Sequence, residues 1–342
     1  MAVTLKEIAQ KAGVSIGTVS RVVKKKPGVS PETRRKIEQI CTELNYTSNS
    51  AGRSLFLKKT KNVVAVIISH RNNTFSQELI RGFKENETIG TEYNVFFEYF
   101  LVSQASEHEM LSVLESVFSL ENLKGIIIRT SSSEEIKEKI STLNTNHIPI
   151  ITCVTDITGI ERLCFVGSDN HAEGRLAAGM LKVIHKNNVH VGLVYGSLKR
   201  LAQKQKVDSF LSTIEESFGA GAVAFQLEIT DQTRIYKETY KQLMLNEVNS
   251  LFILTDVDPV ALAVRNSGIA DKNQQFVSFT FTTRANAKRL FTEGLIQFAI
   301  SENPYESSLT AINMMISHLL GTPLNEKECI VPSEILLPEN TI

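Results

Sequence analysis

The sequence predicts a small all-α headpiece followed by a two-lobed α/β core with parallel, doubly wound sheets. The chain has 342 residues, which exceeds the roughly 100–200 residues of a typical domain. Its charge is divided: residues 1–62 contain 13 Lys and Arg but 4 Asp and Glu, whereas residues 63–342 contain 24 and 33. Short apolar runs alternate with amphipathic segments in the larger part. A basic head on an acidic body indicates a polyanionic partner, the alternative being a solvated basic surface.

Three helices are predicted in the first 46 residues. Thr4 begins a capping box, and the apolar positions after it recur at helical spacing. Gly13 ends this helix, Ser15 caps a second, and Ser30 caps a third. Two short helices with a glycine-containing turn form a helix-turn-helix, which places its second helix in the DNA major groove. The positions expected to face inward are Leu5, Ile8, Ala9, Ala12, Val14, Ile37, Ile40, Cys41 and Leu44.

The same residues resemble a known family. The run TLKEIAQKAGVSIGTVSRVV, then VSPETRRKI and ELNYTSN, is similar over about forty residues to the headpiece of the lactose-repressor (LacI/GalR) family. The resemblance implies a sequence-specific transcription regulator, expected to be a repressor. It also implies that a homodimer binds a palindromic operator on double-stranded DNA, because a two-fold protein reads a two-fold site.

The second helix is expected to read the bases. Ile16 and Gly17 stand where family members contact bases, and here they offer only van der Waals contact. Arg21 is the expected guanine reader, because its fork fits O6 and N7; a surface ion pair is the alternative. Ser15 and Thr33 lie at helix N-termini, where phosphate binding or capping alone would explain them. The other expected headpiece contacts are Thr4, Thr18 and Ser20.

Residues 47–60 match the hinge of the family. There the resemblance implies a short helix that forms on operator DNA and inserts a leucine from each subunit into the minor groove. Ser48 replaces the usual proline and Gly52 a small residue, so more entropy should be lost on ordering. The alternative is a plain linker, with its leucine packed on the core. The contacts assigned to the hinge are Asn49, Ser50, Arg53 and the wedge Leu55.

Strand and helix patterns alternate through the core, residues 61–342. Regular alternation with strands apolar on both faces predicts parallel sheets covered on both sides. About 280 residues is too many for one ordinary sheet, so two lobes are expected. The strand candidates are 63–69, 95–102, 125–129, 148–154, 189–195, 223–228, 250–255 and 276–281. Helical patterns include 76–89, 107–119, 134–143, 171–187 and 305–320.

The order of these elements resembles the periplasmic-binding-protein-like core of the same family. That resemblance implies three crossings between the lobes, expected near 166–168, 301–304 and 325–329. The first lobe should then comprise about 61–166 and 303–325, and the second about 167–301 and 329–342.

An effector is expected in the cleft between the lobes, at the carboxyl ends of the strands. Sugar-binding family members place two lone carboxylates, an Arg and an Asn-Asp pair there. This sequence loses both lone carboxylates and the Arg, which argues against a neutral sugar and for an anionic ligand. Phe75 and Phe279 are expected as stacking walls, with core packing as the alternative. The matching polar positions are occupied by Val154, Lys206, Thr255, Asp256, which is expected to cap a helix, and Thr280.

The controlling partner stays open at this stage. Family members that use a phosphoprotein corepressor carry an Arg where Asn313 stands, which counts against that partner. An inducer, a small-molecule corepressor, or a degenerate cleft controlled by a protein partner all remain alternatives.

Other classes of protein fit poorly. The run Gly219–Ala224 has the letters of a dinucleotide-binding loop but leads from a helix into a strand, the reverse of the required context, and no catalytic motif occurs. An architectural DNA-binding protein would leave the large core without a task. The four cysteines have no metal-ligand spacing, so we expect small buried hydrophobes and neither metal nor cofactor. With no signal peptide or membrane span, we expect a cytoplasmic protein associated with the bacterial nucleoid.

Overall fold

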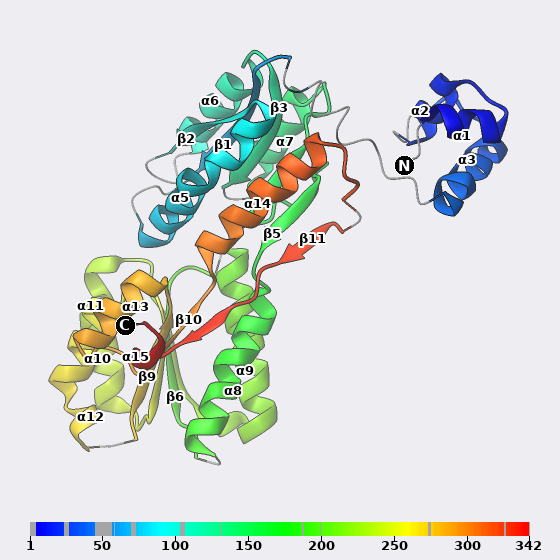
Figure 1. Cartoon of the computed structure of the whole chain (residues 1–342). Helices are drawn as coiled ribbons and strands as arrows, with labels where there is room; N and C mark the ends of the chain where they lie inside the picture. The colour runs from blue at the N-terminus through cyan, green and yellow to red at the C-terminus, as the bar shows by residue number, and fades with distance from the viewer. Residues whose placement is uncertain are drawn as a thin grey trace.

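A headpiece and a two-lobed core make up the computed structural model (Figure 1). Of the expected site residues, Thr4 and the hinge residues Asn49, Ser50, Arg53 and Leu55 lie outside the part of the chain that the structure describes. The described residues are 5–23, 27–44, 57, 59–69, 73–102, 107–130, 132–186, 188–198, 200–272, 275–324 and 326–341.

The headpiece forms the three expected helices, α1 (Leu5–Ala12), α2 (Ile16–Val23) and α3 (Pro31–Glu43). Both predicted serine caps are confirmed. The Ser15 hydroxyl accepts a hydrogen bond from the Thr18 amide at 3.1 Å, and the Ser30 hydroxyl accepts one from the Thr33 amide at 3.2 Å. The three helices enclose a small core of Ile8, Ala9, Ala12, Val19, Val22, Ile37 and Ile40.

The first lobe is a six-stranded sheet in the order β11-β5-β4-β3-β1-β2. Side chains of β1 alternate between two cores, so every residue of that strand is buried. Val64 and Val66 pack with α5 and α14, which run side by side over one face, while Ala65 and Ile67 pack with α6 and α7 on the other. The strands are β1 (Asn62–Ile68), β2 (Val95–Leu101), β3 (Leu123–Arg129), β4 (Ile150–Cys153), β5 (Cys164–Gly167) and β11 (Glu328–Ile330). The helices are α5 (Thr74–Asn86), η1 (Glu87–Tyr93), α6 (Glu107–Phe118), α7 (Glu134–Leu143) and α14 (Pro304–Leu319).

The second lobe repeats this plan with the order β12-β10-β9-β8-β6-β7. Leu193 of β6 packs toward α8 and α9, whereas its neighbour Val194 packs toward α10 and α11. The strands are β6 (Val191–Tyr195), β7 (Val223–Glu228), β8 (Ser250–Leu254), β9 (Val277–Phe281), β10 (Phe298–Ser301) and β12 (Glu334–Leu336). The helices are α8 (Asn170–His185), α9 (Leu201–Phe218), η2 (Ala220–Ala222), η3 (Gln232–Arg234), α10 (Ile235–Leu245), α11 (Val257–Ser267), α12 (Ile269–Lys272), α13 (Arg284–Thr292) and α15 (Pro338–Thr341).

Three segments cross between the lobes. The first leads from β5 to α8 and the second from β10 to α14, both where the sequence predicts them. The third was predicted at 325–329, which is wrong. Residues Glu328–Ile330 pair in parallel with β5, so they belong to the first lobe and the crossing follows at 331–333. A three-residue strand added at a sheet edge, half exposed, leaves no pattern in the sequence.

The carboxyl ends of the strands face the junction of the lobes. β5 leads directly into the first crossing, and β4, β3, β1 and β2 run parallel to its course through the sheet. β10 leads into the second crossing and is joined by β9, β8, β6 and β7 in parallel. Residues that end these strands therefore meet at the junction.

Candidate functional site

Helix α2 exposes a face that carries both apolar and polar residues. Val19 and Val22 are buried against α1 and α3, which leaves Ile16, Gly17 and Arg21 exposed. Ile16 has 49% of its surface exposed although it is a large apolar residue. An exposed apolar side chain on this face can make van der Waals contact with a thymine methyl.

Arg21 is available for a partner outside the chain. No carboxylate in the described part of the chain forms an ion pair with it, which removes the alternative of a surface ion pair within the described residues. Ser20 and Thr18 are half-buried, and the Thr18 hydroxyl lies 2.9 Å from that of Ser15. The Thr33 hydroxyl accepts a hydrogen bond from the Ser30 hydroxyl at 2.8 Å, so in this structure Thr33 takes part in the N-terminal cap of α3.

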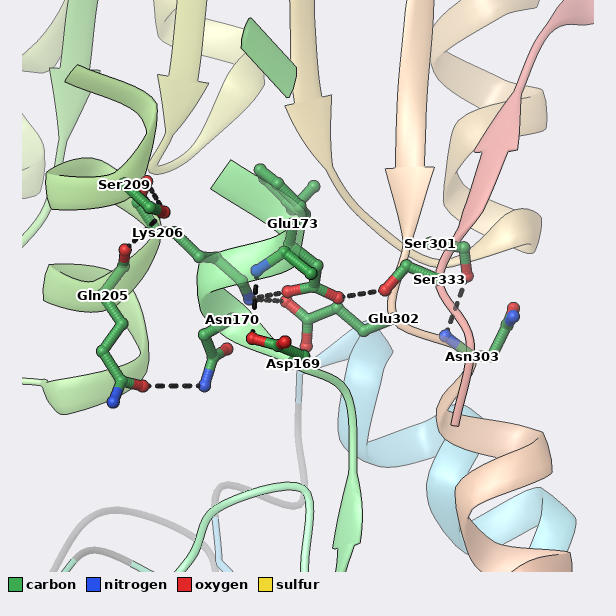
Figure 2. Close-up of polar contacts among 12 residues, drawn as sticks. Asp169, Asn170, Glu173, Gln205, Lys206, Ser209, Ser301, Glu302, Asn303 and Ser333 are labelled. Carbon is green, nitrogen blue, oxygen red and sulfur yellow. Dashed lines mark hydrogen bonds and ion pairs between the residues drawn. The ribbon is translucent and has the colours of Figure 1, made fainter. Parts of the chain in front are cut away.

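A buried charged cluster lies at the junction of the lobes (Figure 2). The ammonium of Lys206 on α9 binds Glu302 on the second crossing and lies 3.0 Å from the Glu173 carboxylate on α8. Glu173 in turn accepts a hydrogen bond from Ser333 on the third crossing. Side-chain exposure is 6% for Lys206 and 1% for Glu173. Lys206, Glu173, Glu302 and Ser333, here called the lysine cluster, thus join α8, α9 and two of the crossings.

The lysine cluster corrects the expected role of Lys206. Burial by itself lowers the pKa of the Lys206 ammonium, but Glu302 and Glu173 outweigh burial and raise that pKa. Burial and then Glu302 raise the pKa of the Glu173 carboxyl, against the lowering effect of Lys206. Lys206 is therefore charged and already paired with two carboxylates. It is not the unpaired cation that an anionic effector requires.

Two further effector residues were wrongly predicted. Phe279 is fully buried and stacks between Phe252 and Phe298, with ring centroids 4.9 and 4.5 Å away, so the core alternative is correct for this side chain. Thr280 is also buried, and its hydroxyl donates to the Ile253 carbonyl at 2.8 Å. Both point into the second lobe because alternate residues of β9 face opposite cores and neither face is solvent.

The remaining predicted positions stay near the strand ends. Asp256 caps α11, as expected, by accepting from the Asp258 amide at 3.3 Å. Thr255 is half-buried just before it. Val154 follows β4 with a left-handed φ of 66°, unusual for a β-branched residue, and its amide donates to the Val166 carbonyl at 2.7 Å.

Phe75 remains accessible, and it meets a residue that the sequence reasoning did not single out. Its ring lies 5.2 Å from the guanidinium carbon of Arg129, the last residue of β3. Arg129 donates to the Ser69 carbonyl at 2.9 Å and to the Ser76 hydroxyl at 2.8 Å. A cation at the carboxyl end of a parallel strand, directly after three buried isoleucines, was a signal in the sequence, because such ends line ligand sites.

The other residues missed from sequence are the partners of Lys206. Glu302 stands directly before the Asn-Pro pair of a predicted crossing, so its position was foreseeable but its pairing was not. Glu173 lies in an amphipathic helix and Ser333 in a loop, and neither has a local pattern that distinguishes it from a surface residue. In the described part of the chain, no group of three His, Cys, Asp or Glu is placed to hold a metal ion, and no helix has the length and apolarity of a membrane crossing.

Comparison with known proteins agrees with this architecture. Residues 4–49 match the model of bacterial regulatory proteins of the lacI family, and residues 64–323 match a periplasmic binding protein domain. The ribose operon repressor of Lactococcus lactis is 30% identical over 260 residues, which covers 76% of this chain and 74% of that protein. The chain belongs to the lacI family of bacterial regulatory proteins. This lacI-family chain is a DNA-binding transcription regulator.

Other relatives extend the likeness over nearly the whole chain. The catabolite control protein A of Staphylococcus epidermidis is 26% identical over 350 residues, covering 98% of this lacI-family chain and 97% of its own. Among solved structures, GanP, a glucose-galactose binding protein from Geobacillus stearothermophilus, covers 82% of this chain and 99% of its own at a TM-score of 0.70 and 22% identity. That structural likeness concerns the fold of the core.

Proposed function

We propose that the protein is a homodimeric repressor that binds a palindromic operator and whose operator affinity is set by a small molecule bound at the junction of its lobes. The exposed face of α2 carries this proposal, because Ile16, Gly17 and Arg21 project from a helix whose other side is buried. The names of the relatives, a ribose operon repressor and catabolite control proteins, support control by a carbohydrate metabolite. A regulator of this kind acts where the chromosome is, in the cytoplasm.

The headpiece and hinge divide the DNA contacts between them. Arg21 reads a base in the major groove, and Ser15, Thr18, Ser20 and Thr33 position the headpiece on the backbone. By its resemblance to the family hinge, Leu55 is the minor-groove wedge, with Thr4, Asn49, Ser50 and Arg53 as further contacts. The effector carries an anionic group, because the carboxylates that neutral sugars require are missing from positions 154 and 280.

The experiment is selection of bound sites by the full-length protein from random double-stranded DNA, followed by affinity measurements on the selected operator and on random DNA. We expect a palindrome. Arg21→Ala should cost about 1–3 kcal/mol on the operator and relax one symmetric position, because a bidentate guanine contact is lost.

Lys11→Ala is the matched control. Lys11 is a similarly exposed cation of the headpiece, but it pairs with Glu43 at 3.1 Å. Its loss should leave the ratio of operator to random binding unchanged. An unchanged ratio for Arg21→Ala as well would exclude Arg21 as a base reader, and a failure to enrich any sequence would refute the proposed function.

A further inference from the structure

Arg129 is a cation at the lobe junction without a carboxylate partner in the described part of the chain. Its Nη1 is satisfied by Ser69 and Ser76, but its Nε is buried and has no hydrogen-bond partner among the described residues. The contrast with Lys206 is direct, since that ammonium has two carboxylates. The buried Lys206 and the half-buried Arg129 thus lie at one junction, and among the described residues only Lys206 is paired with carboxylates.

A cation in this position is unfavourable unless an anion accompanies it. Removal of a charged group from water is unfavourable, and a buried donor without an acceptor adds to that cost. Burial lowers the pKa of the Arg129 guanidinium, and the negative charge of Glu302 offsets that effect only in part. A guanidinium nevertheless stays protonated in proteins, so the charge persists.

The surroundings of Arg129 suit a ligand that is both anionic and ring-shaped. The half-buried ring of Phe75 lies against the guanidinium and offers an apolar face beside it. Arg200, the residue before α9 in the second lobe, is exposed and acts on Arg129 as a like charge. Two cations from opposite lobes repel each other, and an anion between them converts that repulsion into attraction.

We propose that Arg129 binds a carboxylate or phosphate group of the effector, with the sugar portion against Phe75 and Arg200 completing the site from the other lobe. This proposal rests on the proposed function, since it names the chemical class of the effector. It moves the anion site from Lys206 on α9 to the carboxyl end of β3. A guanidinium is suited to this task because its planar fork matches both anions with two hydrogen bonds.

The test uses the full-length protein and two readouts, thermal melting and operator affinity. The probes are ribose 5-phosphate, gluconate and inorganic phosphate, with ribose and glucose as neutral counterparts. We expect ribose 5-phosphate or gluconate to raise the melting temperature and change operator affinity, and ribose and glucose to do neither at equal concentration. Ribose 5-phosphate and inorganic phosphate test for recognition of a phosphate group, whereas gluconate tests for recognition of a carboxylate.

Three variants locate the site. Arg129→Gln should weaken binding of the active probe at least tenfold, and Arg129→Lys should weaken it less because the charge remains but the fork is lost. Since the lysine variant keeps the charge and most of the packing stem, it also guards against a failure to fold. Arg265→Gln is the matched control, because this exposed arginine is in the last turn of α11, at the end away from the junction.

The outcomes distinguish the inference from the proposed function. Binding of neutral sugars only, binding of an anion that survives Arg129→Gln, or no response to any anion would each overturn the inference. If the operator is still selected and bound in those cases, the proposed DNA-binding function stands. Loss of operator binding by the unmodified protein would instead count against the proposed function.

Discussion

At the scale of single residues, partners decide what a charge does. Lys204 and Lys206 lie on one helix, two positions apart, yet they have opposite surroundings. Lys204 is exposed and forms an i,i+4 pair with Asp208, whereas Lys206 is buried between two carboxylates. Water screens the exposed Lys204–Asp208 pair, so this pair contributes little to the stability of the fold. In the lysine cluster, the ammonium is shielded from water, and the two carboxylates balance its charge.

We expect Lys206→Met to lower the free energy of unfolding by about 3–5 kcal/mol, because it leaves the buried Glu173 and the half-buried Glu302 without their cation. Urea unfolding followed by circular dichroism measures this. Lys204→Met is the control and should change the same quantity by less than about 0.5 kcal/mol. Equal losses in both variants would show that helix α9, and not the cluster, is the source of the effect.

At the scale of elements, close helix packing gives the lysine cluster its geometry. Helices α8 and α9 lie side by side in the second lobe, and Gly174 is where their backbones approach. A Cβ atom at Gly174 would lie 2.3 Å from the Lys206 carbonyl oxygen and 2.9 Å from the Phe210 amide nitrogen. No side chain can occupy that space without separating the helices.

Gly174→Ala should therefore lower the free energy of unfolding by about 1–3 kcal/mol, the usual cost of overpacking. Gly179 on the same helix is the matched control, because a Cβ there meets no atom within 4 Å. Gly179→Ala should raise stability by about 0.5–1 kcal/mol, since alanine loses less backbone entropy in a helix. Thermal and urea unfolding of both variants test the pair; a stable Gly174→Ala protein would contradict the close approach.

At the scale of the whole molecule, the lobes are linked by three crossings, two of which the lysine cluster binds. Glu302 and Ser333 come from separate crossings and both contact the α8–α9 pair, through Lys206 and Glu173 (Figure 2). The lysine cluster thus ties α8 and α9 to the second and third crossings. An effector that draws Arg129 and Arg200 together would act on the same junction.

We expect the molar mass from sedimentation to be twice the chain mass of 38.1 kDa. We also expect two chains to bind each palindromic operator. Sedimentation velocity, alone and with labelled operator, measures both. Insertion of half a helical turn between the half-sites should abolish high affinity, because the two headpieces would then face different sides of the duplex. A single chain that binds one half-site with full affinity would contradict the dimer.

Local patterns determined most of the fold. The serine caps at Ser15 and Ser30, the alternation of apolar runs and helical segments, and the position of the first two crossings were all predictable, because each depends on neighbouring residues. The strands β5, β10, β11 and β12, of three or four residues each, were missed, whereas the equally short β4 was predicted within the apolar run 148–154. The match of the headpiece to its family likewise needed only a continuous stretch of sequence.

Tertiary structure alone decided which side chains are free. Lys206 finds Glu302 at a separation of 96 residues, and Glu173 finds Ser333 at 160, so no local pattern could show that the lysine is neutralised. Phe279 belongs to the core only because α8 and α9 cover its face of β9. Within the described residues the Arg129 Nε has no hydrogen-bond partner, and no local pattern in the sequence could show that. Burial and charge pairing are properties of contacts distant in sequence, and the candidate effector site depends on both.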